Sequence, residues 1–397
     1  MQTLTPALKA FIASHTAEEA EKLLLAAARY PGIDIPFAVE QLTARRQVRD
    51  KLPAWHANHD IIYPSRLAAE QCSSEATARY KQHLLRGTSC CDLTGGLGAD
   101  AFYFAAAIPE VTYIERNPEY CEAARHNFAV LHADNIRVRQ ADVRDIAAQL
   151  HAGTCYIDPA RRSEGNKRLF ALEDCEPDIL QLKTTLLQRC ERLIVKISPM
   201  ADIAETLRLL PETREIHIVE TRNECKELLF VLEQHPAPLP PGEVPLHAAT
   251  LSPGTPPEIF TFTLQEEREA PLETTERVGS YLYEPHAALL KSGAFKTLAL
   301  RYGLRKLHRH SHLYTSDTLR ADFPGRKFRT EACLEFSGKL LKHISRDIPQ
   351  ANLTTRNFPL SVAELRRRSR IREGGDTYLF ATTLANGQKA IILCHKA

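Results

Sequence analysis

The sequence predicts an α/β protein whose central sheet lies between a helical N-terminal domain and a small α+β C-terminal region. Three observations support this fold class. Apolar residues recur at helical spacing over residues 1–85, short apolar runs alternate with helical segments over 86–235, and the last third mixes short strand-like and helical patterns. With 397 residues, of which 44% are hydrophobic and 25% charged, the chain is expected to form two or three soluble globular domains.

Residues 1–85 are predicted to form a helical domain without a targeting segment. The apolar run Leu23–Ala28 has only six residues and is bounded by Lys22 and Arg29, which is too short for a signal peptide or a membrane span. Ten scattered cysteines without a CxxC pair are typical of free thiols in a reducing compartment. We therefore expect a cytoplasmic protein that makes no membrane contact.

Residues 86–235 are predicted to form a largely parallel sheet with helices on both faces. Eight of the 24 prolines follow over residues 236–257, so that 236–280 is expected to be a Pro-rich linker and an arm with one strand, EIFTFTLQ. Residues 281–325 and 326–397 are predicted as two small α+β units. The seven apolar runs of the sheet are SCCDL, VTYIE, IRVRQ, TCYID, RLIVKIS, EIHIV and ELLFVLE.

The first turn from a strand to a helix in the central domain is rich in glycine and has the sequence DLTGGLGADAF, residues 92–102. Glycines at such a junction let the backbone approach a ligand and leave the amides of the helix N-terminus facing it. Gly96, Gly98 and Ala101 also match the GxGxxA form of a dinucleotide fingerprint. The turn alone therefore predicts a nucleotide-type ligand and leaves an NAD-linked oxidoreductase open.

Acids follow three successive strands around this turn. Asp92 stands four residues before Gly96, where a nicotinamide-binding strand usually ends in an apolar residue, and its carboxylate can accept hydrogen bonds from an amino-bearing or cationic ligand. Glu115 ends the next strand, where an acid can hold both hydroxyls of a ribose, and Asp142 follows the third, where an acid commonly meets an adenine amino group. Each acid alone is also typical of a helix cap. Together they favour a cofactor that contains a nucleoside.

The motifs DLTGGLGAD, VTYIERNPEYCEAARHN, RVRQADV and YIDPA resemble those of class I S-adenosylmethionine-dependent methyltransferases, in particular the branch with trimethylguanosine synthase and the N6-adenine methyltransferases. The resemblance implies a Rossmann-like class I methyltransferase domain with a seven-stranded sheet, and S-adenosylmethionine as cofactor. It also extends to the upstream segment EQCSSEATA. The residues that it implies for cofactor binding are Ser74, Thr77, Asp92, Thr94, Gly96, Gly98, Glu115 and Asp142.

Residues 282–317 and 357–383 resemble the ferredoxin-like and THUMP-like modules of a bacterial family of class I methyltransferases. This similarity extends over nearly the full chain. It implies a ferredoxin-like unit at 281–325 and a THUMP-like domain at 326–397. Because THUMP domains usually capture RNA, it also implies a methyltransferase that modifies a base of rRNA or tRNA.

The fourth strand leads into CYIDPARR, residues 155–162, which partly matches the Asp-Pro-Pro-aromatic motif of the amino-methylating branch. In that branch the polar residue and a proline carbonyl accept hydrogen bonds from the target amine, and the aromatic ring stacks on the base. Asp158 and Pro159 match, whereas Ala160 and Arg161 replace the second proline and the aromatic residue. We expect Asp158 and Pro159 at the reaction centre and Arg161 in contact with the substrate. This departure argues against N6-adenine as the target.

Charge is distributed unevenly along the chain. Residues 281–397 contain 21 Lys and Arg against 9 Asp and Glu, whereas the preceding 280 residues contain 30 against 40. A basic C-terminal region favours a polyanionic partner such as RNA, with DNA also possible, whereas a basic surface without a partner is the alternative. The predicted substrate-binding residues are Arg162, Lys196, Arg305, Lys306, Arg309, Arg366 and Arg367.

Two local patterns complete the C-terminal prediction. Ser361 and Glu364 are spaced as a capping box for a short helix that carries arginines. The histidine-rich segment 308–312 lacks cysteine or carboxylate partners at suitable spacing, so that no metal site is predicted.

The sequence therefore predicts a cytoplasmic S-adenosylmethionine-dependent methyltransferase that acts on RNA. Three alternatives remain open: a nucleic-acid-binding protein whose methyltransferase domain no longer turns over, a DNA or protein methyltransferase, and an NAD-linked oxidoreductase. Asp92 and the segment after the fourth strand argue against the oxidoreductase.

Overall fold

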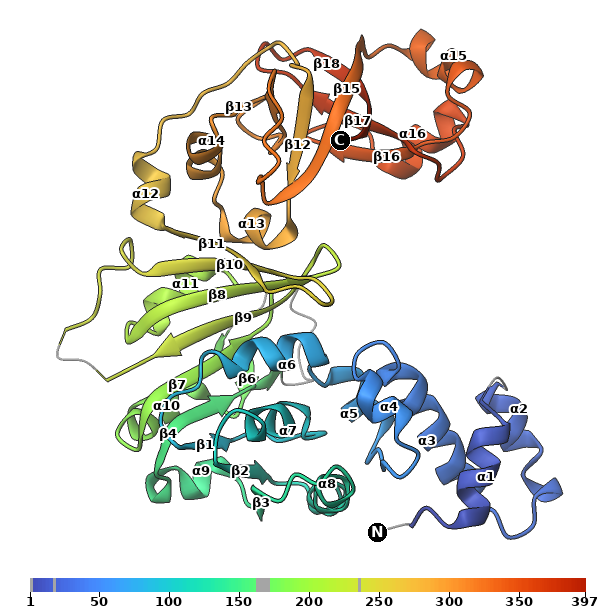
Figure 1. The fold of residues 1–397 in the computed structure, drawn as a ribbon, viewed down its shortest axis with the longest axis vertical. Coiled ribbons are helices and arrows are strands. Elements are labelled where there is room, and N and C mark those ends of the chain that lie inside the picture. The colour runs from blue at the N-terminus through green and yellow to red at the C-terminus, as the bar shows by residue number, and fades with distance from the viewer. Residues whose placement is uncertain (1–2, 17–18, 162–171, 235–236) are drawn as a thin grey trace. The chain divides into compact units, whose positions relative to one another are not determined.

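The computed structural model of the protein describes residues 3–16, 19–161, 172–234 and 237–397. The chain divides into two compact units, whose elements are labelled in Figure 1. Unit 1 consists of Met1–Val219, Glu227–Pro241 and Leu251–Pro257. Unit 2 consists of Glu220–Lys226, Gly242–Thr250 and Glu258–Ala397.

Helices dominate the start of unit 1, as the apolar spacing predicts. Several begin at a side chain that accepts a hydrogen bond from a backbone amide, as Asp34 does from Phe37 and Ser74 does from Thr77. The elements are α1 (Pro6–Ser14), α2 (Ala20–Leu25), the 3-10 turn η1 (Ala27–Arg29), α3 (Ile35–Val48), α4 (Pro53–Ala57), α5 (Arg66–Gln71) and α6 (Glu75–Gln82).

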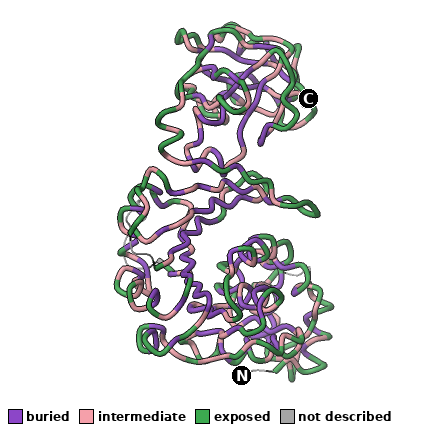
Figure 2. Tube along the Cα trace, turned by 60° about the vertical axis from the view of Figure 1, so that its left-hand side comes forward, coloured by how far each residue is buried: buried purple, intermediate pink, exposed green. Residues whose placement is uncertain are grey.

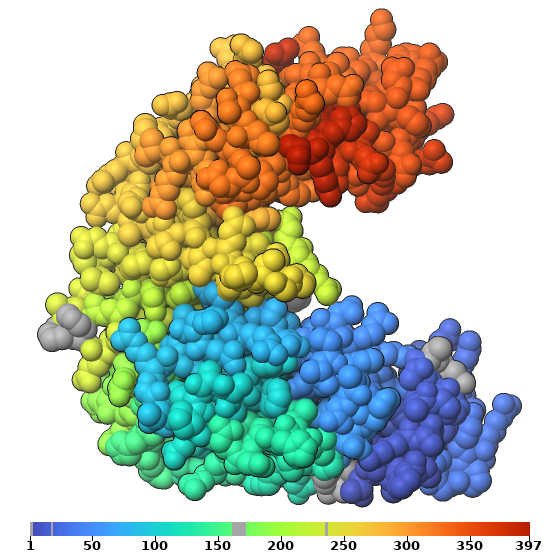
Figure 3. All heavy atoms as spheres, in the orientation of Figure 1, coloured from blue at the N-terminus to red at the C-terminus, as the bar shows by residue number. Residues whose placement is uncertain are grey.

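These helices pack against the start of the sheet region of the same unit. Trp55 of α4 is fully buried and meets Phe102 edge to face, with 5.7 Å between the ring centroids. Val48 of α3 and Leu97 of the glycine turn belong to the same hydrophobic cluster. Figure 3 shows residues of α4–α6 (blue) beside those that follow β1 (cyan). The N-terminal helices therefore support the glycine turn from one side.

The main sheet has the strand order β11-β10-β8-β9-β7-β4-β1-β2-β3. The strands β1, β2, β3, β4 and β7 run parallel, and β9 is antiparallel to β7. The order reverses at β1, which lies between β2 and β4, so that ligands are expected beyond the carboxyl ends of these strands. The strands are β1 (Ser89–Asp92), β2 (Glu110–Glu115), β3 (Ile136–Gln140), β4 (Ala152–Ile157), β7 (Cys190–Ile197), β8 (Thr213–Thr221), β9 (Glu224–Leu232), β10 (Pro245–Leu251) and β11 (Glu258–Thr263).

All seven strands predicted for this sheet are present, and the strand predicted from EIFTFTLQ is β11, but the sheet has nine strands rather than seven. The additional pair, β10 and β11, includes part of the region predicted as a Pro-rich linker. Proline density excluded a helix there, but it did not exclude a strand, because Pro245 occupies the first position of β10, where proline is tolerated. Further prolines lie in the turn between β10 and β11.

Helices and short elements connect the parallel strands. In β4, every residue from Gly153 to Ile157 is buried, and Figure 2 shows buried residues (purple) along the sheet. The connecting elements are α7 (Ala99–Ala105), α8 (Pro118–Val130), α9 (Val143–Ile146), η2 (Ala147–Gln149), β5 (Ala160–Arg161), η3 (Leu172–Asp174), β6 (Cys175–Glu176), α10 (Ile179–Leu187) and α11 (Ile203–Leu209).

Unit 2 contains a second sheet with the order β13-β14-β12-β15-β18-β17-β16. The two predicted α+β units share this sheet, because β12 of the first pairs with β15 of the second. Successive residues of β17, such as Leu379 and Phe380, belong to two different hydrophobic clusters, one on each face of the sheet. The elements are α12 (Leu264–Glu269), β12 (Tyr281–Pro285), α13 (Ala287–Ser292), α14 (Lys296–Tyr302), β13 (Arg305–Lys306), β14 (Tyr314–Ser316), β15 (Gly325–Glu335), α15 (Gly338–Asp347), β16 (Asn352–Arg356), α16 (Val362–Ser369), β17 (Thr377–Thr383) and β18 (Lys389–Lys396).

A search of the helices in the described ranges finds none with the length and apolar character needed to cross a membrane.

We predict that Gly95→Ala destabilises unit 1 by about 1–3 kcal/mol, because a Cβ at this position would overlap the ring of Tyr113. Thermal unfolding of the two proteins measures the effect. Gly338→Ala is the control, because a Cβ there meets nothing within 4 Å. Equal unfolding midpoints for wild type and Gly95→Ala would show that the turn has room for a side chain.

Candidate functional site

The glycine turn between β1 and α7 is held by side chains of β2. The amide of Gly96 donates a hydrogen bond to Oε2 of Glu115 (3.1 Å), and the hydroxyl of Tyr113 donates to the carbonyl of Gly96 (2.6 Å). Gly96 and Gly98 have φ values of +54° and +90°, which other residues rarely adopt. A Cβ on Gly98 would also lie 2.8 Å from the ring of Phe128. Both predicted glycines therefore shape this turn.

Two predicted acids lie beside the turn. Asp92 is 1% exposed, and its Oδ1 accepts a hydrogen bond from the amide of Thr94 (3.3 Å). Burial raises the pKa of Asp92 well above its usual range, and the nearby carboxylate of Asp100 raises it further. Glu115 also accepts the amide of Asn117 at 2.8 Å. Since each carboxylate oxygen has two lone pairs, both acids keep acceptor capacity for a ligand.

Asp142 is engaged within its own segment. It is the N-cap of α9, where its Oδ1 accepts the amide of Arg144 (2.9 Å), and it also forms an ion pair with the Arg144 guanidinium (2.6 Å). Hydrogen bonds from that guanidinium lower the pKa of Asp142. In the structure Asp142 therefore acts as a helix cap, as the alternative interpretation of these acids expects. Its contact with a ligand stays a prediction.

Asp158 and Lys196 meet at the carboxyl ends of two adjacent parallel strands. The register pairs Ile157 of β4 with Val195 of β7, which brings the next residues of both strands together. Lys196 Nζ lies 2.5 Å from Oδ2 of Asp158, and the Asp158 amide donates to the hydroxyl of Thr94 (2.8 Å). The predicted residues Thr94 and Lys196 are thus linked through Asp158, whose backbone amide binds the first and whose carboxylate binds the second.

This ion pair is partly withdrawn from solvent. Burial acts to lower the pKa of Lys196, but the carboxylates of Asp158 and Glu227 raise it above its usual range. The ammonium of Lys196 was predicted to bind substrate directly. In the structure it binds Asp158 and so orients that carboxylate, and its contact with substrate stays a prediction.

The segment after Asp158 begins a short hairpin. Pro159 is buried, and Ala160 and Arg161 form β5, which pairs antiparallel with β6. Only the backbone of Arg161 is described, and Arg162 lies outside the described residues. Their predicted contacts with substrate stay predictions.

Ser74 and Thr77 are placed at the start of α6. The hydroxyl of Ser74 accepts the Thr77 amide at 3.3 Å and therefore caps the helix, and Thr77 is buried. Both residues precede Lys81 on α6, although whether they contact a cofactor stays a prediction.

A buried polar cluster around Lys81 was not predicted from the sequence. The Lys81 ammonium is fully buried and lies 2.7 Å from Oδ1 of Asp100, 3.2 Å from Oε2 of Glu227 and 2.9 Å from the hydroxyl of Ser73. The Tyr156 hydroxyl lies 3.3 Å from the same ammonium and donates to Asp100 at 3.2 Å. We call these five residues the Lys81 cluster. It joins α6, α7, β4 and β9.

The pKa values of the two acids of the Lys81 cluster are shifted in opposite directions. Burial favours a raised pKa for Asp100, but the ammonium groups of Lys81 and Lys196 hold that pKa below its usual value. Burial raises the pKa of Glu227 despite the same two lysines. One sequence signal could have revealed the cluster: Thr77, Ala78 and Lys81 form a buried stripe at helical spacing. A lysine within such a stripe needs a buried acid.

Carboxylates outnumber ammonium groups in this part of unit 1. Beside Asp92, Asp100, Asp158 and Glu227, the ammonium groups found among the residues that the structure describes are those of Lys81 and Lys196, and the pKa of Asp92 is influenced by Asp100 and Asp158. Such an excess of acidic groups with few counter-charges favours a ligand that carries positive charge.

The predicted substrate-binding residues of the C-terminal region lie in unit 2. Arg305, Arg309 and Arg367 are exposed, and Arg366 is half-buried and 3.7 Å from Glu373. The predicted capping box of Ser361 and Glu364 is confirmed at the start of α16.

Lys306 differs from its prediction as a substrate contact. It is 1% exposed, and its ammonium donates to the carbonyl of Arg309 (3.0 Å) and lies over the ring of Phe295. Burial lowers its pKa to about 8. The ammonium therefore stabilises the loop after β13 from inside, where a phosphate cannot reach it.

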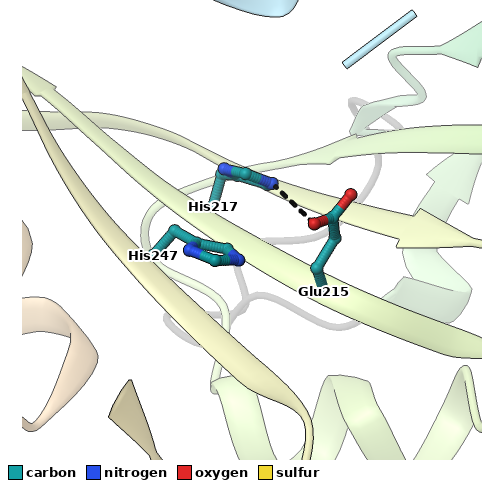
Figure 4. A group of neighbouring side chains, drawn as sticks. All are labelled: Glu215, His217 and His247. Atoms are coloured by element: carbon teal, nitrogen blue, oxygen red, sulfur yellow. Dashed lines mark ion pairs between the residues drawn. The ribbon is translucent and has the colours of Figure 1, made fainter. Parts of the chain in front are cut away.

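A glutamate and two histidines, Glu215, His217 and His247, lie on β8 and β10 toward one edge of the main sheet. Glu215 and His217 of β8 form an ion pair of 3.8 Å when the histidine is protonated, and Nδ1 of His217 lies 2.7 Å from the Tyr80 hydroxyl. Figure 4 shows this pair together with His247, which belongs to β10. We assign no catalytic role to these three side chains.

The fold and the site together define the class of protein. A parallel sheet with its switch point at β1, a glycine turn after that strand and acids at the following strand ends are the features of a Rossmann-like domain that binds a nucleotide-type cofactor. Two family models match the C-terminal part of the chain: a ferredoxin-like domain at residues 281–324 and a THUMP domain-like region at residues 325–396.

The chain belongs to a bacterial family of class I methyltransferases that carries these two C-terminal domains. It is 40% identical to a protein from Porphyromonas gingivalis W83 that is provisionally assigned as a methyltransferase. That crystal structure superimposes with a TM-score of 0.90, and the match covers 98% of each chain.

A second similarity is to ribosomal RNA small subunit methyltransferase J of Rhodopseudomonas palustris (strain HaA2). The two sequences are 28% identical over 129 residues, which cover 28% of this chain. The chain matches 59% of the length of that relative.

We predict that Lys81→Met destabilises unit 1 by about 3–5 kcal/mol, because it leaves two carboxylates buried without their cation. Urea unfolding at neutral pH measures the change. Lys22→Met, at an exposed lysine of α2, is the control and should change stability by less than about 0.5 kcal/mol. A loss for Lys81→Met as small as that of the control would contradict the assigned role.

Lys306 should make stability depend on pH. Its pKa is about 8 in the folded state and 10.5 in the unfolded state, so that the unfolded chain binds more protons between these values and stability rises with pH in that window. Below pH 8 the full cost of burying the charge, about 3 kcal/mol, is present. We expect the free energy of unfolding of wild type, relative to Lys306→Met, to increase between pH 8 and 10. A constant difference would mean that the lysine titrates normally.

Proposed function

We propose that the protein is an S-adenosylmethionine-dependent methyltransferase that modifies RNA. The observation that carries this proposal is the junction of the glycine turn with Asp158 and Lys196 at the carboxyl ends of β1, β4 and β7. Membership of the methyltransferase family supports the reaction type. The THUMP domain-like region and the ribosomal RNA methyltransferase among the relatives support RNA as substrate.

The chemistry of the acidic residues fits this cofactor. When bound, S-adenosylmethionine supplies an electrophilic methyl group on a positively charged sulfur. Asp92 offers a buried carboxylate with unused acceptor capacity, which suits an ammonium group, and the surplus of acids around it suits a cation. Glu115 would accept hydrogen bonds from the ribose hydroxyls, while Gly96 and Gly98 let the backbone approach the ligand.

The remaining cofactor contacts are carried over from the resemblance alone. Asp142 would face the adenine amino group, and Ser74 and Thr77 would close over the methionine end. Thr94 has a contact of its own, because its hydroxyl accepts the Asp158 amide and so fixes the distance between the glycine turn and the reaction centre.

Asp158 would orient the nucleophile of the substrate. Lys196 binds its Oδ2, and among the described residues Oδ1 accepts no hydrogen bond, so that this oxygen can receive an N–H or O–H of the substrate. The carboxylate would accept the proton that the nucleophile loses as the methyl group is transferred. Pro159 would fix the backbone at this position, and Arg161 and Arg162 would bind a neighbouring phosphate.

The test is methyl transfer from radiolabelled S-adenosylmethionine to RNA from cells that lack the protein, followed by identification of the labelled nucleoside. We expect Asp158→Asn to lower the transfer rate about 100-fold or more, because the nucleophile loses its acceptor. Lys196→Met should act in the same direction. Affinity for the cofactor, measured by calorimetry, should change less than about threefold.

Asp134→Asn is the matched control, because Asp134 is exposed and lies away from the strand ends that form the site. It should methylate RNA like wild type. Label in protein or DNA but not in RNA would refute the proposed substrate. Wild-type turnover by Asp158→Asn would refute the proposed reaction centre.

A further inference from the structure

An arginine–glutamate–arginine group in unit 2 has no role in the site described above. Glu284 on β12 is 1% exposed, and both of its oxygens bind arginines. Arg326 of β15 donates to Oε2 through Nε (2.7 Å) and Nη2, and Arg356 at the end of β16 donates to Oε1 through Nε (3.2 Å) and Nη2 (2.8 Å). We call these three residues the Glu284 clamp.

Each guanidinium of the Glu284 clamp uses only one edge. A guanidinium has five N–H donors, and the Nε–Nη2 edge faces Glu284 in both cases, which leaves the donors of Nη1. The side chains of Arg326 and Arg356 are 36% and 35% exposed, and neither has another hydrogen-bond partner among the described residues. Two ordered, partly exposed forks are therefore available to a ligand.

The charge of the Glu284 clamp also points to an anion. One carboxylate compensates one arginine, so that the second leaves a surplus of one positive charge. Of the charged and titratable side chains around it, His286, His312 and Lys327 are basic, whereas the buried acid Glu220 lies 3.5 Å from His286. Burial lowers the pKa of His286, and Lys327 and Arg326 lower it further; burial and Lys306 lower the pKa of His312 to about 4, with Arg356 contributing.

We propose that the Glu284 clamp binds a backbone phosphate of the RNA substrate, with Arg326 and Arg356 as the contacts and Glu284 as the residue that positions them. The inference rests on the proposed function, because the RNA is the substrate proposed above. Two planar forks with fixed edges suit the oxygens of a phosphodiester. Holding both with a buried acid reduces the conformational entropy that binding would otherwise cost.

A purely structural tie is the alternative. The clamp links strands from the ferredoxin-like and the THUMP domain-like regions, and such a link would also stabilise unit 2. A tie and a phosphate site differ in their response to salt, because only a phosphate contact contributes to the salt dependence of RNA binding.

The experiment measures binding of the full chain to total RNA from cells that lack the protein, at several salt concentrations, for wild type, Arg326→Gln and Arg356→Gln. Each single variant leaves Glu284 one arginine, so that folding is retained. We expect each to weaken binding about 5- to 10-fold and to reduce the slope of log K against log salt by about 1. Arg329→Gln, an exposed position on the same strand β15, should weaken binding less than twofold.

Arg356→Lys separates geometry from charge. It keeps the positive charge but not the fork, so that we expect a slope close to wild type with affinity lowered about threefold. If both glutamine variants bind RNA with the affinity and salt slope of wild type but unfold at a lower midpoint, the proposed phosphate site is overturned. The Glu284 clamp would then be a structural tie. If the glutamine variants lost affinity for single-stranded DNA but bound RNA like wild type, the assignment to RNA would be overturned.

The outcome is independent of catalysis. If wild type binds RNA and the glutamine variants lose affinity, the clamp stands even when no labelled nucleoside forms and the proposed methyl transfer fails. If wild type methylates RNA and the variants bind it normally, the clamp fails and the proposed function stands.

Discussion

The buried ammonium of Lys81 is the interaction on which the site in unit 1 depends. A lysine without solvent contact is tolerated only because Asp100 and Glu227 lie within ion-pair distance and Ser73 and Tyr156 complete its hydrogen bonds. These partners come from α7, β9, the segment before α6, and β4. Because α7 begins at the glycine turn and β4 ends directly before Asp158, the same contacts fix the distance between the predicted cofactor side and the predicted reaction centre.

The two units differ in the sign of the charge that their functional residues carry. Within its described residues, unit 1 gathers four carboxylates near the ammonium groups of Lys81 and Lys196, which suits a cationic methyl donor. Unit 2 carries exposed arginines and the Glu284 clamp, which suit a polyanion. A nearly neutral chain therefore contains two regions of opposite sign, and its net charge of +2 conceals both.

Local pattern was enough to predict most of the fold. The strands of the main sheet follow directly from apolar runs, and the Ser361 capping box follows from a spacing of three residues. Strand β10 was missed because Pro245 and the prolines on either side of the strand mask a short apolar run. Lys81 and Lys306 were not predicted to be buried, because nothing in the local sequence distinguishes a buried lysine from one at the surface. Only the tertiary partners, which are distant in sequence, distinguish the two.

The hairpin after β4 gives a physical reason for the departure from the amino-methylating motif. Ala160 lies in β5 opposite Glu176 of β6, and a second proline at that position would remove an amide from a strand that pairs antiparallel. The chain therefore forms a short ladder where the related branch has a rigid Pro-Pro turn. With an arginine in place of the aromatic residue, recognition would shift from stacking on a base toward binding of a phosphate. Phosphate binding by this arginine agrees with the basic C-terminal region, because the arginine and that region would both hold the RNA by its backbone. The groups around Asp158 would then select the base.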